Sequence, residues 1–454
     1  MNFNSLEFLI LFLPTTLIAF YAVPMRMRLL VLISASLFFY GVSGLEVLAA
    51  FVVTVLWTML TAQLFGRWPK ALAVVAAVSV PMLFLVLFKY LNFILNTLHA
   101  PTQARDVFQL FLSITLPAGI SFYTFEMVSY SADVANKKIQ REGSLLRFAS
   151  FATFFPHLIA GPIMRYADLR DQLQALQVTR ILKPNIVSGL KFLSIGLFAK
   201  VFLADLSGIV VDHAREAPSE TITALDQIAQ IGFWSMQIYY DFWAYSIMAI
   251  GLGRLFCIEL PVNFRQPYLS ANPQEFWRRW HVTLSYWIRD YLYIPLGGNK
   301  SYARNILFVF AIVGLWHGAG WNFVAWGFYH GVLVVIYHFT SATWDRLPKP
   351  LAIGFNFALV SLGWPLFFMD FAQYAAFLGH LVTAPWAVGI YHAPYWIYLT
   401  GLGVVTFAFD EQNWLYNMLD RRTTILDSPI TLALLMFTGL IFISLSKTFI
   451  YFRF

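Results

Sequence analysis

One histidine stands at the end of a long apolar run, in the segment GLWHGAGWNFVAWGFYHG at residues 314–331. His317 follows NILFVFAIVGLW, and an ionisable side chain in such a run is costly and often functional. A neutral imidazole can take a proton from a hydroxyl group at cytoplasmic pH, because the unperturbed pKa of histidine is near 6.5. Gly314, Gly318 and Gly320 would let backbone and substrate approach closely. We therefore consider His317 a candidate general base; the alternative is a histidine hydrogen-bonded between helices.

Three further polar residues in apolar surroundings are secondary candidates. His330 repeats the His-Gly pair thirteen residues after His317. Asp241, in MQIYYDFWAYSIMAIGLGR, could orient a histidine or a substrate hydroxyl, or it could pair with a buried arginine. His157 lies in an apolar segment interrupted by prolines and is a candidate for lining a cavity.

Several familiar chemistries lack their simplest sequence support. The chain has no HExxH, GxSxG or Walker A motif and no cluster of metal-ligand residues, so we expect no bound metal. The single cysteine, Cys257, excludes an intramolecular disulfide. The net charge of +7 is spread over short segments between apolar runs, and no nucleic-acid-binding motif is present. We therefore expect no nucleic acid partner.

The composition is that of an integral membrane protein. Of 454 residues, 59% are hydrophobic and 12% are charged, whereas soluble domains carry about 25% charged residues. Spanning helices need roughly 20 mostly apolar residues. This length predicts about 11 spans plus re-entrant or interfacial helices, in an all-α polytopic protein. The candidate segments are 5–23, 28–42, 46–65, 71–97, 108–134, 186–210, 222–252, 305–317, 320–341, 351–370, 394–410 and 429–447.

The charge distribution predicts the topology. Lys and Arg gather in residues 137–183 and 254–304, which the positive-inside rule places in the cytoplasm, with the N-terminus outside. No linker or internal repeat is evident, so we expect a single membrane domain over residues 1–454. The chain would be a multi-pass membrane protein, in contact with membrane lipid.

Two segments differ from ordinary spans. In FATFFPHLIAGPIMRYADL at 151–169, Pro156, Gly161 and Pro162 interrupt a short apolar run, which predicts a re-entrant element lining a cavity. In NPQEFWRRWHVTLSYWIRDYLYIPLGGNK at 272–300, aromatic and apolar residues recur every three or four positions. That pattern predicts an amphipathic helix in the cytoplasmic interface, with Asn272 as N-cap and Pro273 as its first residue.

Taken together, these segments resemble the membrane-bound O-acyltransferase (MBOAT) family. The resemblance is carried by PVNFRQPYLS, EFWRRWHVTLSYWIRDYLYIPLGGNK and GLWHGAGWNFVAWGFYHG, and by FKYLNF, LPAGISFYTFE, FFPHLIAGPI and the C-terminal FIYFRF. It is strongest to the bacterial branch that serves alginate O-acetylation and D-alanyl-lipoteichoic acid transfer, which implies a multi-pass protein of the bacterial inner membrane. The resemblance implies a fold with a central channel and places the catalytic histidine of the family at His317.

The resemblance also implies substrates and partners. A cytoplasmic donor, acetyl-CoA, would meet an acceptor hydroxyl from outside, and His317 would act as general base. The acceptor would be an exported glycan such as alginate, cellulose or peptidoglycan, or an external (periplasmic) acetyltransferase that relays the group. A D-alanyl carrier protein is an alternative donor. Arg278, Arg279, Lys300 and Arg304 could attract the CoA phosphates, or they could contact lipid headgroups. Further candidates for lining the channel or binding the donor are Trp316, Asn322, His281 and His157.

A function of another class is also compatible with the residues. Intramembrane His and Asp residues can serve a proton relay. The chain could therefore be a transporter, an acyl conduit or a scaffold of a polysaccharide secretion complex, without chemistry of its own. Release of free CoA from acetyl-CoA would distinguish the enzyme from these alternatives.

Overall fold

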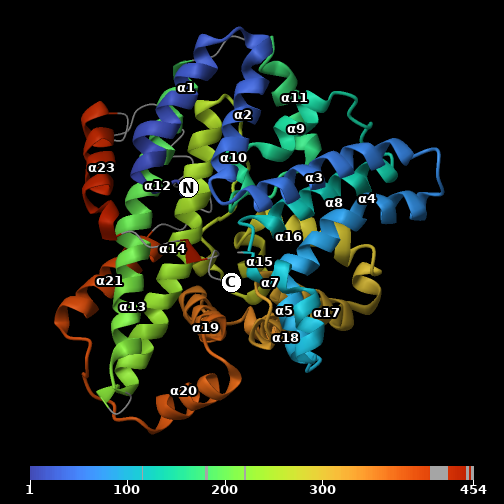
Figure 1. Ribbon diagram of the computed structural model, residues 1–454. Coiled ribbons are helices and arrows are strands. Elements are labelled where there is room, and N and C mark those ends of the chain that lie inside the picture. The colour runs from blue at the N-terminus through green and yellow to red at the C-terminus, as the bar shows by residue number, and fades with distance from the viewer. Residues whose placement is uncertain (115, 179–182, 219–220, 409–427, 446–448, 451–454) are drawn as a thin grey trace. The chain divides into compact units, whose positions relative to one another are not determined.

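The computed structural model describes residues 1–114, 116–178, 183–218, 221–408, 428–445 and 449–450. Every regular element in these ranges is a helix, and no β-strand occurs among them, which confirms the all-α prediction for this part of the chain (Figure 1). The chain forms two compact units. The first comprises residues 1–193 and 249–261, and the second comprises residues 194–248 and 262–454. A single membrane domain over residues 1–454 stays a prediction.

The first unit is built mainly from the N-terminal helices. An aromatic cluster forms part of its core, where the buried ring of Phe155 lies 5.3 Å from Phe12 and 5.5 Å from Phe39. Its α-helices are α1 (Leu13–Ala22), α2 (Arg28–Gly41), α3 (Leu45–Thr61), α4 (Lys70–Leu85), α5 (Leu91–Thr97), α6 (Thr102–Val107), α7 (Gln109–Ser113), α8 (Ile120–Ala135), α9 (Leu145–Thr153), α10 (Phe155–Leu158) and α11 (Tyr166–Ala175).

The second unit holds most of the remaining helices, and the chain passes between the units within α12 (Lys183–Ala199) and α14 (Ala224–Leu255). One π-helical turn, η5 (Lys200–Asp205), follows α12 directly. The α-helices of the second unit are α13 (Leu206–Glu216), α15 (Pro273–Arg279), α16 (Val282–Ile288), α17 (Tyr302–His317), α18 (Trp321–Trp344), α19 (Lys349–Gly363), α20 (Phe371–Thr383), α21 (Ala393–Phe407) and α23 (Pro429–Ile441).

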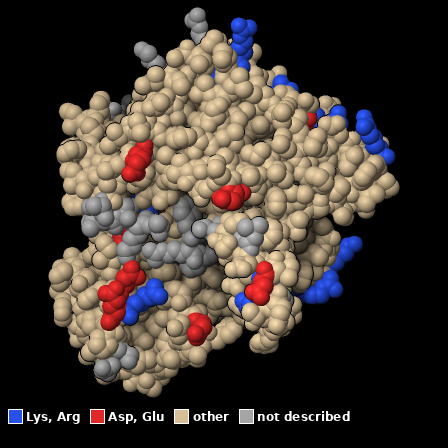
Figure 2. Space-filling model, in the orientation of Figure 1, with Lys and Arg blue, Asp and Glu red and all other residues tan. Residues whose placement is uncertain are grey.

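Several helical segments are suited to cross a bilayer. Among the described residues, five are long and apolar enough by length and composition: 45–64, 70–97, 186–216, 321–344 and 349–367. Two shorter apolar helical segments cover 7–22 and 429–441. On the face shown in Figure 2, charged side chains form only small, separated patches. These features support a polytopic membrane protein, while the total of about 11 spans stays a prediction.

Two apolar segments of the first unit are interrupted. The predicted break within 151–169 is confirmed, because α9 ends at Thr153 and only the four-residue α10 follows before an irregular stretch. The prediction of one continuous span over 108–134 is wrong. Pro117 has no N–H to donate and Gly119 has a φ of 76°, so α8 begins only at Ile120.

The predicted single amphipathic helix at 272–300 is also wrong. The chain forms α15, α16 and a short π-helical turn, and His281 breaks the helix with a φ of 44°. The hydroxyl of Ser285 donates to the carbonyls of Trp277 and Trp280, at 3.0 and 3.4 Å, across this break. The aromatic face of segment 272–300 is covered by protein, since Phe276 and Trp280 are each 1% exposed. The predicted start is confirmed: Asn272 accepts a hydrogen bond from the Glu275 N–H, and Pro273 opens α15.

Candidate active site

The position of His317 depends on how closely α17 approaches α18. Gly314 on α17 and Gly327 on α18 face the neighbouring backbone, and a Cβ on either would overlap a carbonyl group of the other helix. This close approach brings the ring of His317, the last residue of α17, to 5.0 Å from the ring of Trp326, with the planes nearly perpendicular. His317 is 3% exposed. The glycine-rich sequence therefore serves helix packing next to the histidine.

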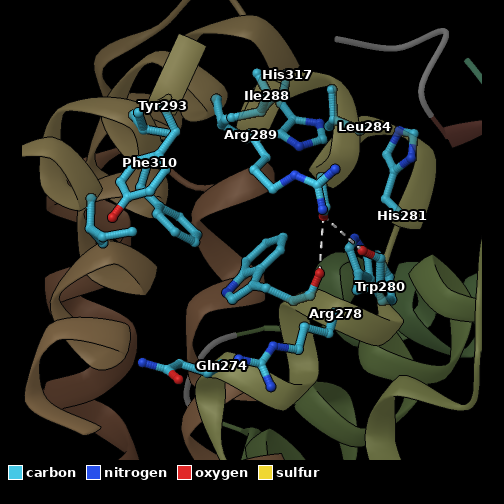
Figure 3. A pocket seen from close by; sticks show the side chains of 15 residues that line it. Gln274, Arg278, Trp280, His281, Leu284, Ile288, Arg289, Tyr293, Phe310 and His317 are labelled. Carbon is cyan, nitrogen blue, oxygen red and sulfur yellow. Dashed lines mark hydrogen bonds between the residues drawn. The ribbon is translucent and has the colours of Figure 1, made fainter. Parts of the chain in front are cut away.

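His317 lines a cavity of about 220 Å³ within the second unit. None of the residues that line it, all of them within the described ranges, is an Asp or a Glu. The lining is Gln274, Trp277, Arg278, Trp280, His281, Leu284, Ser285, Ile288, Arg289, Tyr293, Ile306, Val309, Phe310, Val313 and His317. In Figure 3 the imidazoles of His317 and His281 lie at one end of the view, and Gln274 and Arg278 lie at the other. The predicted base and two predicted donor-binding residues are thus brought together.

The second histidine, His281, is held in a defined state. Its Nδ1 lies 3.0 Å from Oδ1 of Asn263, which also accepts hydrogen bonds from the backbone N–H and the hydroxyl of Thr283. Because the backbone N–H can only donate, Oδ1 is the acceptor and His281 carries its proton on Nδ1. The lone pair is then on Nε2. His281 lies between two seven-residue helices, outside the spanning helices, and burial lowers its pKa to about 3. It therefore stays neutral at physiological pH.

Two arginines contribute positive charge to the cavity. Arg278 is exposed, and in Figure 3 its side chain lies on the side away from His317. Arg289 forms hydrogen bonds of 2.6 and 3.1 Å with the carboxylate of Asp290, and Figure 3 shows its guanidinium extending below His317. Guanidinium groups bind phosphate and other anions. The cavity therefore combines two imidazoles, of which that of His281 is neutral, with two arginines, of which Arg289 is ion-paired with Asp290.

Several predicted site residues do not line this cavity. Arg279 is ion-paired with Glu275. Asn322 donates a 2.8 Å hydrogen bond to the carbonyl of Leu366. The buried Trp316 packs with its ring 4.9 Å from that of His317. The other two candidate phosphate ligands, Lys300 and Arg304, are exposed and are also absent from the lining.

His330 lies behind the cavity among aromatic rings. Its ring is 4.9 Å from Trp326 and 5.2 Å from Trp277, and it is 1% exposed. Neither of its nitrogens has a hydrogen-bond partner among the described residues. Trp326 thus contacts both His317 and His330.

The two remaining candidates have charged partners. The carboxylate of Asp241 lies 2.7 Å from the ammonium group of Lys200. Its partner is therefore a lysine, and the alternative prediction of a buried arginine is wrong. In the first unit, Nδ1 of His157 lies 2.9 Å from the Glu126 carboxylate, and its Nε2 lies 3.1 Å from the carbonyl of Phe151. His157 is completely buried in these contacts. Among the described residues, no group of His, Cys, Asp and Glu could hold a metal ion.

Comparison with known proteins identifies the chain. The sequence model of the membrane-bound O-acyltransferase (MBOAT) family matches residues 43–369 of the chain. This range includes all residues that line the cavity. The chain belongs to the membrane-bound O-acyltransferase family. It is therefore an O-acyltransferase with a multi-pass membrane fold, as the resemblance predicted.

Relatives of this O-acyltransferase carry three different names. A probable alginate O-acetylase, AlgI, of Azotobacter vinelandii is 39% identical over 385 residues, covering 81% of this chain and 75% of that protein. A peptidoglycan O-acetyltransferase of Helicobacter pylori is 33% identical over 410 residues, covering 80% and 76%. A teichoic acid D-alanyltransferase of Bacillus subtilis is 28% identical over 270 residues, covering 55% and 68%.

Sequence reasoning missed two residues of this acyltransferase that the geometry brings to the site. Asn263 sets the tautomer of His281, and Trp326 contacts both His317 and His330. Asn263 gave a weak signal, as one of two amides between Pro261 and Pro267 just ahead of the aromatic motif. Trp326 gave none, because one more tryptophan in a chain with 15 does not stand out.

Proposed function

We propose that this O-acyltransferase moves an acetyl group from cytoplasmic acetyl-CoA to a hydroxyl group of an exported polysaccharide. The transfer occurs in the bacterial inner membrane, directly or through an external acetyltransferase. Alginate and peptidoglycan, which appear in the names of two relatives, are both carbohydrate polymers that carry hydroxyl groups. The relatives described above give no support to cellulose as the acceptor.

The observation that carries the proposal is that His317 and two arginines line one cavity. The imidazole of His317 takes the proton of the acceptor hydroxyl as its oxygen attacks the thioester carbonyl. The new O–C bond forms, the C–S bond breaks, and the proton passes from the imidazole to the departing CoA sulfur. Arg278 and Arg289 supply charge for the CoA phosphates on the donor side.

His281 assists as a hydrogen-bond acceptor. With its proton on Nδ1, bound to Asn263, it presents the lone pair of Nε2. A neutral imidazole in this state can accept a hydrogen bond from a second, neighbouring hydroxyl of the acceptor, and so hold the acceptor while His317 takes the proton of the reacting hydroxyl.

The lining of the cavity favours acetyl over D-alanyl as the transferred group. A D-alanyl group carries an ammonium ion, which a buried site must pair with a negative charge. None of the described residues that line the cavity is acidic, and the carboxylate of Asp290, which follows the lining residue Arg289, is already paired with that arginine. An uncharged acetyl group needs no such partner. The D-alanyltransferase relative therefore does not guide the proposal.

Replacement of His317 by alanine tests the proposal. The purified His317→Ala protein, given acetyl-CoA and a polysaccharide acceptor, should release CoA about 10²- to 10⁴-fold more slowly than the wild type. The matched control is His213→Ala, at an exposed position of α13, which should retain the wild-type rate. Mass spectrometry of exported glycans should show the same pattern in cells. Wild-type acetylation in the His317→Ala strain would contradict the assignment.

A further inference from the structure

A buried group of charges lies in the second unit, away from the cavity lining. Lys200 lies in the π-helical turn η5, and its ammonium group contacts the carboxylates of Asp205 and Asp241, at 2.5 and 2.7 Å. All three side chains are almost completely buried. Ionisable groups in such surroundings are costly, and π-helical turns are frequent at functional sites. Within this charge cluster the ammonium group of Lys200 contacts both carboxylates.

The second oxygen of Asp241 holds the end of the chain. Oδ2 accepts a 2.7 Å hydrogen bond from the backbone N–H of Ile450, while Oδ1 contacts Lys200. Phe449 and Ile450 are 1% and 2% exposed. The charge cluster therefore fixes these two residues against α14.

The same two residues connect to the catalytic cavity through one aromatic ring. Phe449 packs with its ring 5.6 Å from Phe242, the residue after Asp241 on α14. The ring of Phe242 also contacts His281, with the ring centroids 4.7 Å apart and the planes nearly perpendicular. His281 lines the cavity together with His317. A displacement of Phe449 thus reaches His281 through a single intermediate ring.

We propose that Asp241 is a positioning residue for acyl transfer, which holds the chain end at Phe449–Ile450 and thereby keeps Phe242 against His281. The inference rests on the proposed function, since it takes the His281 side of the cavity as the place where the acceptor reacts. Asp241 itself touches no substrate. Its loss therefore lowers the turnover number and leaves the KM for acetyl-CoA near its wild-type value.

The decisive variant is Asp241→Leu. Leucine has a similar size but accepts no hydrogen bond, and Lys200 and Asp205 remain as an equal pair of opposite charges. Substitution of Lys200 is less suitable, because it would leave two buried carboxylates without their cation. The matched control is Asp212→Leu on α13, where the carboxylate is 39% exposed.

Two measurements test the proposal. In a Cys257→Ser background, maleimide labelling of Ile450→Cys reports the accessibility of the chain end and needs no substrate. We expect slow labelling with Asp241 and at least tenfold faster labelling with Asp241→Leu. The turnover number should fall by at least about tenfold, with the KM for acetyl-CoA within twofold. Asp212→Leu should change neither quantity.

Unchanged labelling in Asp241→Leu would overturn the proposal, and so would faster labelling with a wild-type turnover number. If Asp241→Leu does not fold, Phe449→Ala probes the same link from the chain end and should show the same split between turnover and KM. If the wild type does not use acetyl-CoA at all, the proposed function fails. The labelling rate alone then decides whether Asp241 holds the chain end.

Discussion

The close approach of α17 and α18 gives a sharp prediction for Gly314→Ala. The added Cβ would overlap the carbonyl oxygen of Phe323 and lie 2.9 Å from its carbonyl carbon. Ordinary carbon contacts begin near 3.5 Å, so the helices must separate by roughly 0.6 Å or more. His317 lies one turn after Gly314, and its ring contacts Trp326 on the opposite helix. The substitution therefore moves His317, the proposed base, relative to the rest of the cavity.

A shift of this size affects both the rate and the stability. A misplacement of about 1 Å can lower a rate by on the order of 10²-fold, while overpacking costs about 1–3 kcal/mol of stability. We expect Gly314→Ala to fold and to transfer acetyl groups roughly 10- to 100-fold more slowly. The assay is CoA release from acetyl-CoA with a saturating acceptor, with thermal unfolding in detergent as the test of folding.

Two other glycines of the second unit calibrate the result. A Cβ at Gly354 on α19 would meet nothing within 4 Å, so Gly354→Ala should keep the wild-type rate. A Cβ at Gly331 on α18 would lie 3.0 Å from Cβ of Phe310, and Gly331→Ala should give an intermediate loss. The reasoning is refuted if Gly314→Ala and Gly354→Ala transfer acetyl groups at equal rates.

Two further predictions concern charge. Asn263→Asp places a carboxylate against His281 and should raise its pKa from about 3 by roughly 1–3 units. The ratio of the transfer rate at pH 5 to that at pH 8 should then be up to about tenfold lower in the variant than in the wild type. Identical pH profiles of the two proteins would contradict the role of Asn263. In the first unit, burial opposes ionisation of Glu142, but hydrogen bonds from Arg147, Tyr166 and the Ser144 N–H outweigh it and lower its pKa to about 2. Because the folded state has the lower pKa, this stabilisation is complete above about pH 4.5 and is lost as the pH falls toward 2. Glu142→Gln should therefore lower the free energy of unfolding at pH 7 by about 1–2 kcal/mol, and the Tm at pH 7 with it. The difference in Tm between pH 7 and pH 3 should be smaller in the variant than in the wild type. An unchanged Tm at pH 7 would contradict this role of Glu142.

Local chemistry made some features of this acyltransferase predictable. The Asn-Pro pair at 272–273 identifies a helix start, because an amide side chain caps free N–H groups and proline lacks one. The prolines of 151–169 identify a broken helix for a similar reason. His317 could be singled out because an ionisable side chain within an apolar run is costly and is therefore usually functional. Each of these signals depends only on neighbouring residues.

Other features depend on contacts that the sequence does not contain. The aromatic period of 272–300 indicates an apolar face, but the pattern is the same whether lipid or protein covers that face. The turn at His281 could not be predicted either. Histidine tolerates a positive φ better than most residues, so the turn needs no glycine that would mark it in the sequence. Asp241 and Lys200 are 41 positions apart, so nothing local shows that they pair. Tertiary contacts decided these cases.

The acid-free lining of the cavity also bears on a competing reaction. Water is a nucleophile too, and a base that activates a hydroxyl group can activate a water molecule and waste the thioester by hydrolysis. Beside the imidazoles the wall is largely aliphatic and aromatic, with Leu284, Ile288, Val309 and Val313 among the lining residues, and such walls hold water poorly. A transferase and a thioesterase can share the same catalytic base. In the proposed reaction the two nucleophiles differ in how they enter: a polymer hydroxyl would be carried into the apolar space by the rest of its chain, whereas a lone water molecule would have to give up its hydrogen bonds.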